Sequence, residues 1–325
     1  MGKYLLRRLV TNVILVAIAA SLAYMLAATT MNPRAAYEGR QPPVAESVID
    51  ATLDGLNMND KTPVLQRYAT WAGGVVTGDF GKTWNGGSVN DEVGRRVMVS
   101  LRLLLIGTLL GFAVGVALGA LSAVRQYKIS DRLIGVGSFV IMAIPVFLLA
   151  TLLAIATYSL NRGLGFTLIE YTGEYNPRLT GWDQFLNRLN HLILPTISLS
   201  LGSIVFYSRI QRNMMLDVLG QDFVRTARAK GLRRRTALTK HALRTALIPS
   251  ATYFAFAFGT MFTGAIFTEK IFAWHGMGAW LVDSINQNDV NSVAAITFFT
   301  AVCVLFAAFL SDVLVAALDP RVRVS

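Results

Sequence analysis

Long stretches without a charged residue divide this chain into alternating apolar and polar segments. The uncharged stretches cover residues 9–33, 103–124, 133–161, 189–208, 245–268 and 290–311. Each holds about 20 residues or more, enough for an α-helix to cross a hydrocarbon core of about 30 Å. The pattern therefore predicts an all-α membrane protein with six transmembrane helices.

The predicted segments alternate between the two sides of the membrane. In chain order they are a cytoplasmic N-terminus (1–8), helix 9–31, an extracytoplasmic segment (32–97), helix 98–124, a cytoplasmic loop (125–132), helix 133–160, an extracytoplasmic loop (161–189), helix 190–212, a cytoplasmic region (213–247), helix 248–268, an extracytoplasmic loop (269–289), helix 290–318 and a cytoplasmic C-terminus (319–325). The first apolar run is longer than the core of a signal peptide, which favours a retained helix. Pro145 predicts a kink in the third helix.

The distribution of charge sets this orientation. The chain has 325 residues, of which 54% are hydrophobic and 15% charged, and its net charge is +11. Ten Lys or Arg and two acidic residues lie within 209–244, whereas 269–289 holds one lysine and three acids. The positive-inside rule places the first of these regions, and with it both termini, in the cytoplasm. The distribution of charge therefore points to a lipid bilayer and not to a nucleic acid as partner. Membrane topology alone would also explain the basic residues of 209–244.

Residues 222–232 predict a short helix with a defined end. Asp222 has the side chain wanted at an N-cap, and residues 223–230 would form a helix of about 12 Å. Gly231 fits the left-handed position that ends a helix, after which Leu232 can fold back against Ala227 in a Schellman motif. Arg228 and Lys230 would lie in the last turn, where the helix dipole favours cations. The result is a rigid helix suited to docking on a partner.

A second helix is predicted directly after this one. Thr236 has a capping side chain, and the helix would run to about Leu247. Pro249 is tolerated as an early residue of the membrane span that follows. His241 lies between these two points, where a packing role is expected in preference to a metal ligand.

The stretch from Asp222 to Pro249 resembles the cytoplasmic coupling loop of ABC-transporter permease subunits. The general pattern there is Glu-Ala-Ala, three residues, Gly, then Ile-x-Leu-Pro. The likeness is greater to the dipeptide and oligopeptide (also nickel) importer branch, whose loops read like D-F-V-R-T-A-R-A-K-G-L followed by H-A-L-R-x-A-L-x-P. Here Arg225 replaces the acidic residue, and 18 positions separate Gly231 from Pro249. Both departures are usual for that branch.

The resemblance implies a type I ABC importer permease fold in the bacterial inner (plasma) membrane. The implied partners are a homologous permease, two cytoplasmic ATPase subunits that bind the ATP, and an extracytoplasmic substrate-binding protein. No cofactor of the chain's own is implied. The residues carried over to coupling with the ATPase are Asp222, Phe223, Arg225, Thr226, Ala227, Arg228, Ala229, Lys230, Gly231, Leu232, His241, Arg244 and Pro249.

Further matches to the same branch are spread over the chain. The sequence GDFGKT at 78–83 ends like a Walker A motif, but Val76 stands where that motif needs its first glycine. The stretch resembles instead the G-D-x-G-x-S of peptide permeases. Residues 268–285 resemble the branch's T-E-x-I-F-x-W-P-G-L-G-x-W-L, with Trp274 and Trp280 suited to the membrane interface. A closing D-P-R stands at 319–321.

The second predicted span carries Gly107, Gly111, Gly115 and Gly119 at a constant spacing of four. Residues four apart share one helix face, so these glycines form a groove in which another helix can approach closely. The spacing leaves open whether that helix belongs to the same chain or to another subunit.

The chain lacks the motifs of an enzyme. It has no complete Walker A, no HExxH, and only one cysteine, Cys303, so a disulfide or thiolate metal site within one chain is excluded. We therefore expect no catalytic residue and no metal site. The expected function is the permease subunit of an ATP-driven peptide importer. Two alternatives stay open: a secondary transporter driven by an ion gradient, and a membrane scaffold that recruits a cytoplasmic partner.

Overall fold

The computed structural model describes residues 2–318. Side chains are described throughout that range except at 2–5, 234, 235, 240, 251, 252, 255–264 and 310–318. Within this part of the chain every regular element is a helix, apart from one isolated bridge between Lys82 and Ser88. The prediction of an all-α protein is therefore confirmed. The motif at 319–321 lies outside the described residues.

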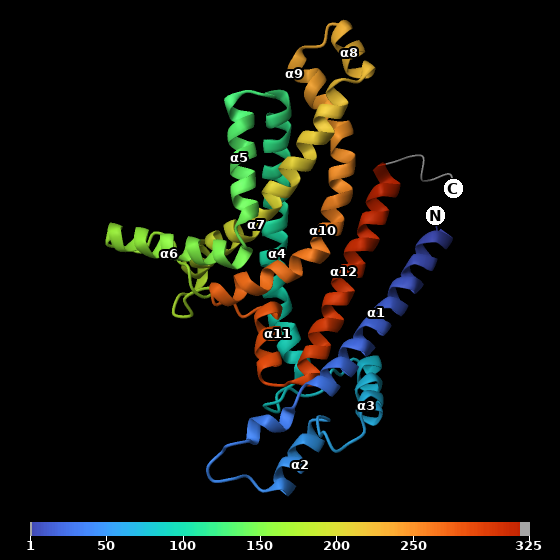
Figure 1. The fold of residues 1–325 in the computed structure, drawn as a ribbon, viewed down its shortest axis with the longest axis vertical. Coiled ribbons are helices and arrows are strands. Elements are labelled where there is room, and N and C mark those ends of the chain that lie inside the picture. Colours follow the sequence, from blue (N-terminus) through green and yellow to red (C-terminus); the bar gives the residue numbers. More distant parts are fainter. Residues whose placement is uncertain (1, 319–325) are drawn as a thin grey trace. The chain divides into compact units, whose positions relative to one another are not determined.

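Figure 1 shows the helices in chain order. They are α1 (Gly2–Thr30), the 3₁₀-helix η1 (Pro33–Tyr37), α2 (Glu46–Gly55), α3 (Val64–Thr77), α4 (Val89–Val124), α5 (Ile129–Ala143), α6 (Val146–Leu164), α7 (Gly181–Leu219), α8 (Asp222–Ala229), α9 (Arg234–Ala237), the π-helical turn η2 (Leu238–Ala242), α10 (Leu243–Ile271), α11 (Met277–Asn286) and α12 (Val290–Leu318). The chain divides into two compact units, 1–101 with 275–306 and 102–274 with 307–325.

Five of these helices are long and apolar enough to cross a membrane, judged on the described residues. They are α1 from Leu6, α4, α6, α7, and α12 as far as Phe309. The predicted fifth span, 248–268, falls within α10, many of whose side chains lie outside the described set. The count of six transmembrane helices stays a prediction.

The third predicted span is not one helix. Instead α5 ends at Ala143 and α6 begins at Val146, and Ile144 between them has an extended backbone with ψ of 122°. A residue before proline is pushed out of the helical region, so Pro145 breaks the helix where only a kink was expected. The single helix predicted over 133–160 is therefore wrong, and Figure 1 shows α6 leaving α5 in a new direction.

In the first unit, aromatic side chains join α1 to α3. The ring of Tyr24 stacks on that of Trp71 with centroids 4.7 Å apart, and Tyr68 packs against both. Tyr24 and Trp71 are buried, and Ser21 of α1 also forms a hydrogen bond with the Tyr68 hydroxyl at 2.7 Å. The extracytoplasmic segment that was predicted from its polarity is thus partly helical and held on α1.

The GDFGKT stretch is a junction between the start of α4 and the start of α12. Asn291 donates hydrogen bonds to the carbonyls of Lys82 and Leu56 at 2.9 and 2.8 Å, and Asp289 accepts one from the Trp84 amide at 2.9 Å. Gly81 has a φ of +88°, and an added Cβ would come within 3.3 Å of Asn291. The positive φ and the close approach of Asn291 both require glycine at position 81. The stretch therefore has a packing role.

Trp274 and Trp280 are both buried, with 2% and 6% of their surface exposed. The expectation that they face the membrane interface is therefore wrong. Trp280 instead lies beneath the guanidinium of Arg96 at 5.4 Å, an attraction between a cation and an aromatic face. Indole rings suit a lipid interface and a protein core alike, so composition alone could not separate the two.

In the second unit, α7 packs against α5, α6 and α10, and α4 presses its four glycines onto α7. A Cβ added to Gly107 would lie 3.2 Å from Leu199, and one added to Gly115 would lie 2.8 Å from the Ile204 carbonyl oxygen. Gly111 meets Ser203, and Gly119 meets the backbone of Ser208. The glycine groove is thus filled by another helix of the same chain.

Candidate functional site

The short helix α8 follows α7 directly and holds most of the residues predicted to couple the chain to an ATPase. It covers Asp222–Ala229, and the residue before it, Gln221, is the N-cap but makes no side-chain capping bond. The prediction that Asp222 caps the helix is therefore wrong, because the helix starts one residue earlier than expected. Asp222 is the first helical residue, where a carboxylate is still favoured by the helix dipole. Figure 1 shows α8 beyond the adjacent ends of α7 and α10.

The end of α8 has the predicted Schellman geometry. Gly231 has a φ of +85°, in the left-handed region. Its amide donates to the Arg228 carbonyl at 3.0 Å, and the Leu232 amide donates to the Ala227 carbonyl at 3.3 Å. These two bonds satisfy carbonyls that the end of a helix would otherwise leave without partners. The stop at Gly231 is therefore where the sequence predicts it, although α8 ends at Ala229, one residue before the expected Lys230.

One face of α8 anchors it to the membrane helices. Val224 and Ala227 are buried, and Val224 belongs to a cluster with Ala123 of α4, Met215 of α7 and Ala242 of η2. Burial of one valine side chain stabilises by about 1.5 kcal/mol or more. The cluster therefore fixes α8 to the ends of three long segments, α4, α7 and the η2–α10 helix.

The other face of α8 and its exit are open to a partner. Phe223 and Leu232 keep 43% and 38% of their surface exposed. The remaining exposed residues of the coupling set are Asp222, Arg225, Thr226, Arg228, Ala229, Lys230, Gly231 and Arg244. Two exposed apolar side chains set among cations and small residues form a surface that can be covered by a protein carrying acidic and apolar groups.

The second half of the coupling stretch differs from the prediction. A continuous helical segment starts at Arg234 and passes through α9 and η2 into α10, so Thr236 is inside a helix and caps nothing. Nor does that segment end near Leu247, because Pro249 lies within α10. The short helix α9 and the wider π turn precede the proline and keep the backbone helical up to it. His241 and Pro249 are half-buried, and the His241 carbonyl accepts a hydrogen bond from Thr245 at 3.1 Å.

A partly buried charge cluster that joins α4, α5 and α7 was not foreseen from the sequence. The guanidinium of Arg212 on α7 donates two hydrogen bonds to the carboxylate of Asp131 on α5, at 2.8 and 3.0 Å. Ser122 of α4 donates to the same carboxylate, and so does the amide of Tyr127 at 2.9 Å. Arg212, followed by these other donors, holds the pKa of Asp131 well below its usual range.

This cluster fixes the turn between α4 and α5. Tyr127 has a φ of +65°, a conformation that non-glycine residues rarely adopt, and the bond to Asp131 helps to hold it. The signal in the sequence was an aspartate in the predicted cytoplasmic loop and an arginine at the end of the fourth span. Their pairing depends on how α5 and α7 pack, which no local pattern reveals.

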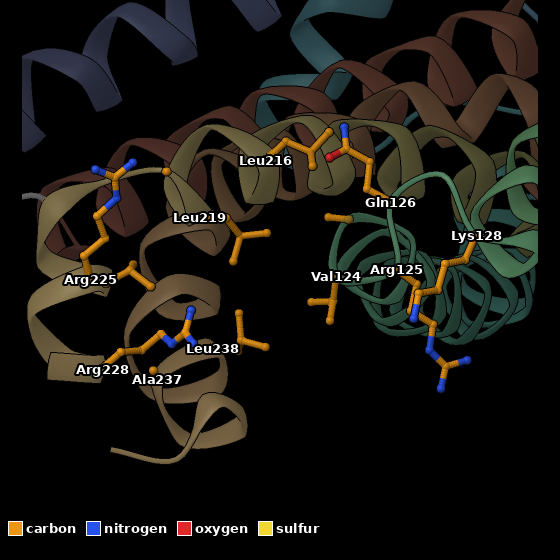
Figure 2. Close-up of a pocket in the computed structure, with 13 residues that line it drawn as sticks. Val124, Arg125, Gln126, Lys128, Leu216, Leu219, Arg225, Arg228, Ala237 and Leu238 are labelled. Carbon is orange, nitrogen blue, oxygen red and sulfur yellow. The ribbon is translucent and has the colours of Figure 1, made fainter. Parts of the chain in front are cut away.

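A pocket of about 730 Å³ separates this turn from α8. Figure 2 shows Leu219 and Leu238 facing Val124 across it, with Arg228 extending toward Leu238 and the guanidinium of Arg225 turned away. Arg125 and Lys128 lie on the wall opposite α8, and among the described residues that line the pocket none is acidic. A lining of apolar and basic side chains suits a partner segment that carries apolar and acidic groups.

Within the described residues, no three His, Cys, Asp or Glu side chains come close enough to hold a metal ion. The arrangement around α8 is one of packing and charge, and it lacks a nucleophile paired with a base. An exposed face that combines apolar and charged side chains suits an interface with another protein.

Comparison with known proteins gives consistent matches. Residues 115–324 match the family described as "Binding-protein-dependent transport system inner membrane component". The chain is 50% identical over 327 residues to the oligopeptide transport system permease protein OppB of Mycobacterium tuberculosis (strain H37Rv), covering 100% of both chains. It is 35% identical over 284 residues, 87% of each chain, to the oligopeptide transport system permease protein AppB of Bacillus subtilis (strain 168).

Among solved structures, the fold matches a chain of the methionine ABC transporter MetNI in an inward-facing conformation. The TM-score is 0.55 at 17% identity, and the match covers 70% of this chain and 96% of the other. At this identity the likeness concerns the fold.

Proposed function

Because this chain belongs to the family of binding-protein-dependent transport system inner membrane components, we propose that it is the permease subunit of an ATP-driven importer of peptides. The permease proteins OppB and AppB named above are described as parts of oligopeptide transport systems, and a dipeptide transport system permease protein, DppB of Bacillus subtilis, is 34% identical over 80% of this chain. These names support di- and oligopeptides as the substrate class.

The proposed complex has four kinds of protein. A homologous permease completes the translocation pathway, two cytoplasmic ATPase subunits bind the ATP, and an extracytoplasmic protein delivers the peptide. The location proposed is the bacterial inner membrane, with both termini in the cytoplasm. The excess of basic residues in 209–244 over 269–289 supports that orientation.

The observation that carries the proposal is the division of α8 into two faces. Val224 and Ala227 are buried against the membrane helices, whereas Phe223 and Leu232 stay exposed. Since the Gly231 stop fixes the length of the helix, α8 can act as a rigid knob that fits a groove on an ATPase subunit. The basic pocket beside it would take an acidic, apolar part of the same subunit.

Coupling then follows from how α8 is anchored. When the ATPase subunits close on ATP, they pull α8, and Val224 passes the displacement to α4, α7 and α10 through the buried cluster. The glycine seam and the Asp131–Arg212 pair keep α4, α5 and α7 moving together. Such a rigid-body motion would switch the pathway between inward-open and outward-open states.

The energy for transport comes, in this proposal, from the partner subunits. The Gly-Lys-Thr at 81–83 belongs to a loop whose Lys82 carbonyl accepts a hydrogen bond from Asn291. It lies in the segment 32–97, which is predicted to be extracytoplasmic and so faces away from ATP in the cytoplasm. The chain itself is a permease subunit and not an ATPase.

The change Gly231→Val tests the coupling role. A β-branched residue in the left-handed region costs about 1–2 kcal/mol, so the Schellman end should open and α8 should lose its fixed length. We expect peptide uptake and copurification of the ATPase to be lost, while the amount of protein in the membrane stays unchanged. Uptake is measured in vesicles holding the complete complex.

The matched control is Gly231→Asn, because asparagine tolerates the left-handed conformation. It should keep most of the uptake. Survival of both uptake and ATPase copurification in Gly231→Val would show that α8 is not the docking element. Flux measured with and without ATP and the copurifying ATPase separates the two alternatives: a gradient-driven transporter would need neither, and a scaffold would show no flux.

A further inference from the structure

One face of α7 is exposed over residues 202–217 and carries polar residues. Gly202, Phe206, Arg209, Asn213 and Asp217 are exposed and recur at intervals of three or four, so they form one stripe on the helix. Between them lie buried residues, and the opposite side of α7 is packed on the glycines of α4. This stripe, the α7 polar face, is the feature that packing within the chain leaves unexplained.

Arg209 is the charged residue of this face that lies among apolar side chains. Its guanidinium is 5.0 Å from the centre of the Phe139 ring and 3.1 Å from the Met142 sulfur, both on α5. None of the acidic residues that the structure describes pairs with it. Arg212, one turn further along, has Asp131 as its partner, so the two arginines have opposite surroundings.

Arg209 lies inside the predicted span 190–212, one turn further from its cytoplasmic end than Arg212. Met142, which its guanidinium touches, is the tenth residue after Arg132, about 15 Å along the helix. That distance is half of a hydrocarbon core of about 30 Å. On the other side, the neighbouring Ser208 meets Gly119, six residues before Arg125 and so about 9 Å along α4 from that charge. The two measures place the guanidinium about 9–15 Å from the charged ends of α4 and α5, inside the predicted hydrocarbon region.

Contact with lipid at this depth is strongly unfavourable. An arginine at the centre of a membrane helix costs about 2.5–3.5 kcal/mol on insertion scales, and intramembrane charges accordingly face water-filled cavities or other protein. Phe206 on the same face has its ring at 6.3 Å from that of Tyr253 of α10, and both are about half exposed. The face therefore combines one cation with aromatic surface.

We propose that the α7 polar face lines the translocation pathway and that Arg209 binds the carboxylate of a peptide as it passes. The inference rests on the proposed function. A guanidinium is always charged and can hold a carboxylate through two parallel hydrogen bonds. Phe139, Phe206 and Tyr253 offer apolar surface to the rest of the peptide without selecting its sequence.

Accessibility to water is tested first, by cysteine labelling. Cys303 is the only cysteine, so Cys303→Ser gives a background in which Arg209→Cys or Phe206→Cys is the single thiol. The complete complex is treated with a membrane-impermeant, negatively charged methanethiosulfonate. The control is Leu109→Cys, an exposed apolar position of α4 within the uncharged stretch. We expect both α7 thiols to react at least about tenfold faster than the control; equal rates at all three positions would overturn the proposal.

Recognition of the carboxylate is tested with trialanine and its C-terminal amide. Hydrogen bonds to a charged group contribute about 1.5–3 kcal/mol, so Arg209→Gln should lower uptake of trialanine about tenfold or more. Uptake of the amide should change less than about twofold, and Arg209→Lys should restore part of the uptake of the free acid. The same binding protein delivers both peptides. Its preference between them therefore cancels when the uptake of each peptide by a variant is divided by its uptake by the wild type.

An equal loss for both peptides would overturn the proposal, since Arg209 would then serve contact with the second permease and not the substrate. If the wild-type complex takes up neither peptide, the proposed function and the carboxylate site both fail. The labelling rates are independent of transport, so they then still decide whether the α7 polar face meets water.

Discussion

The α4–α7 seam and the end of α8 both depend on glycine, for opposite physical reasons. In the seam, Gly115 has an ordinary helical backbone, but a Cβ on it would come within 2.8 Å of the Ile204 carbonyl oxygen. At the end of α8, Gly231 has nothing within 4 Å of an added Cβ, and its φ of +85° is what requires glycine. The first position needs small volume and the second needs backbone freedom.

The difference separates two kinds of region in the protein. The seam and the Asp131–Arg212 pair are completed by the chain itself, so their residues serve stability. The end of α8 leaves Phe223 and Leu232 exposed, and in our proposal its residues serve a contact with the ATPase subunit. Substitutions in the first region should act on folding, and those in the second on binding.

The largest effect on stability is expected from Gly119→Leu. Its side chain would meet the backbone of Ser208 and Arg212, which cannot move without shifting the whole of α7, so the cost should reach about 3 kcal/mol or more. We expect little folded protein in the membrane, measured by yield after mild detergent extraction. Gly137→Leu on α5, where nothing lies within 4 Å of an added Cβ, is the control and should be tolerated. Equal yields of the two variants would contradict the close packing of the α4 glycines against α7.

A smaller loss is expected from Asp131→Asn. The change removes the charge that faces Arg212, and an arginine left in a partly buried site without its partner should cost about 2 kcal/mol. The midpoint of thermal unfolding of the purified protein measures this. Asp222→Asn, on a side chain that is 97% exposed, should stay within about 0.5 kcal/mol of the wild type. A stable Asp131→Asn variant would mean that the pair does not hold the α4–α5 turn.

The smallest effect on stability, with a large effect on binding, is expected from Phe223→Ala. Its ring is 43% exposed, so folding should change by no more than about 0.5 kcal/mol. Loss of an aromatic anchor at an interface can cost about 2 kcal/mol, which corresponds to a Kd for the ATPase subunit raised more than tenfold. Leu65→Ala, an exposed apolar residue in the segment predicted to be extracytoplasmic, should leave that Kd unchanged. If both variants bind alike, α8 is not the contact.

Local patterns predicted the parts of the site whose cause is local. The Schellman stop at Gly231 follows from which backbone angles a glycine can adopt, and the helix end is where it was expected. The glycine groove of α4 follows from the helical repeat, although its occupant did not. Errors of a single position, such as Asp222 taken as the N-cap, arose because Gln221 competes for the same role without a capping side chain.

Other features depend on parts of the chain that are distant in sequence. Asp131 and Arg212 are 81 positions apart and meet only because α5 packs on α7. Thr236 was expected to start a helix because its hydroxyl can cap one, but the helix from Arg234 onward is continuous with α10. Trp280 was assigned to the lipid interface and instead packs under Arg96.

The sequence by itself determined that the chain is helical and spans a membrane, and that α8 stops at Gly231. It also gave the charge distribution from which we propose that residues 209–244 face the cytoplasm. These follow from hydropathy, helical periodicity and the backbone freedom of glycine, which act over a few residues. Only the tertiary structure decided that α7 fills the glycine groove, that Arg212 is neutralised while Arg209 is left exposed, and which face of α8 is free. The reason is physical: burial and charge pairing depend on distances in space, and a chain sets those distances only once its helices have packed.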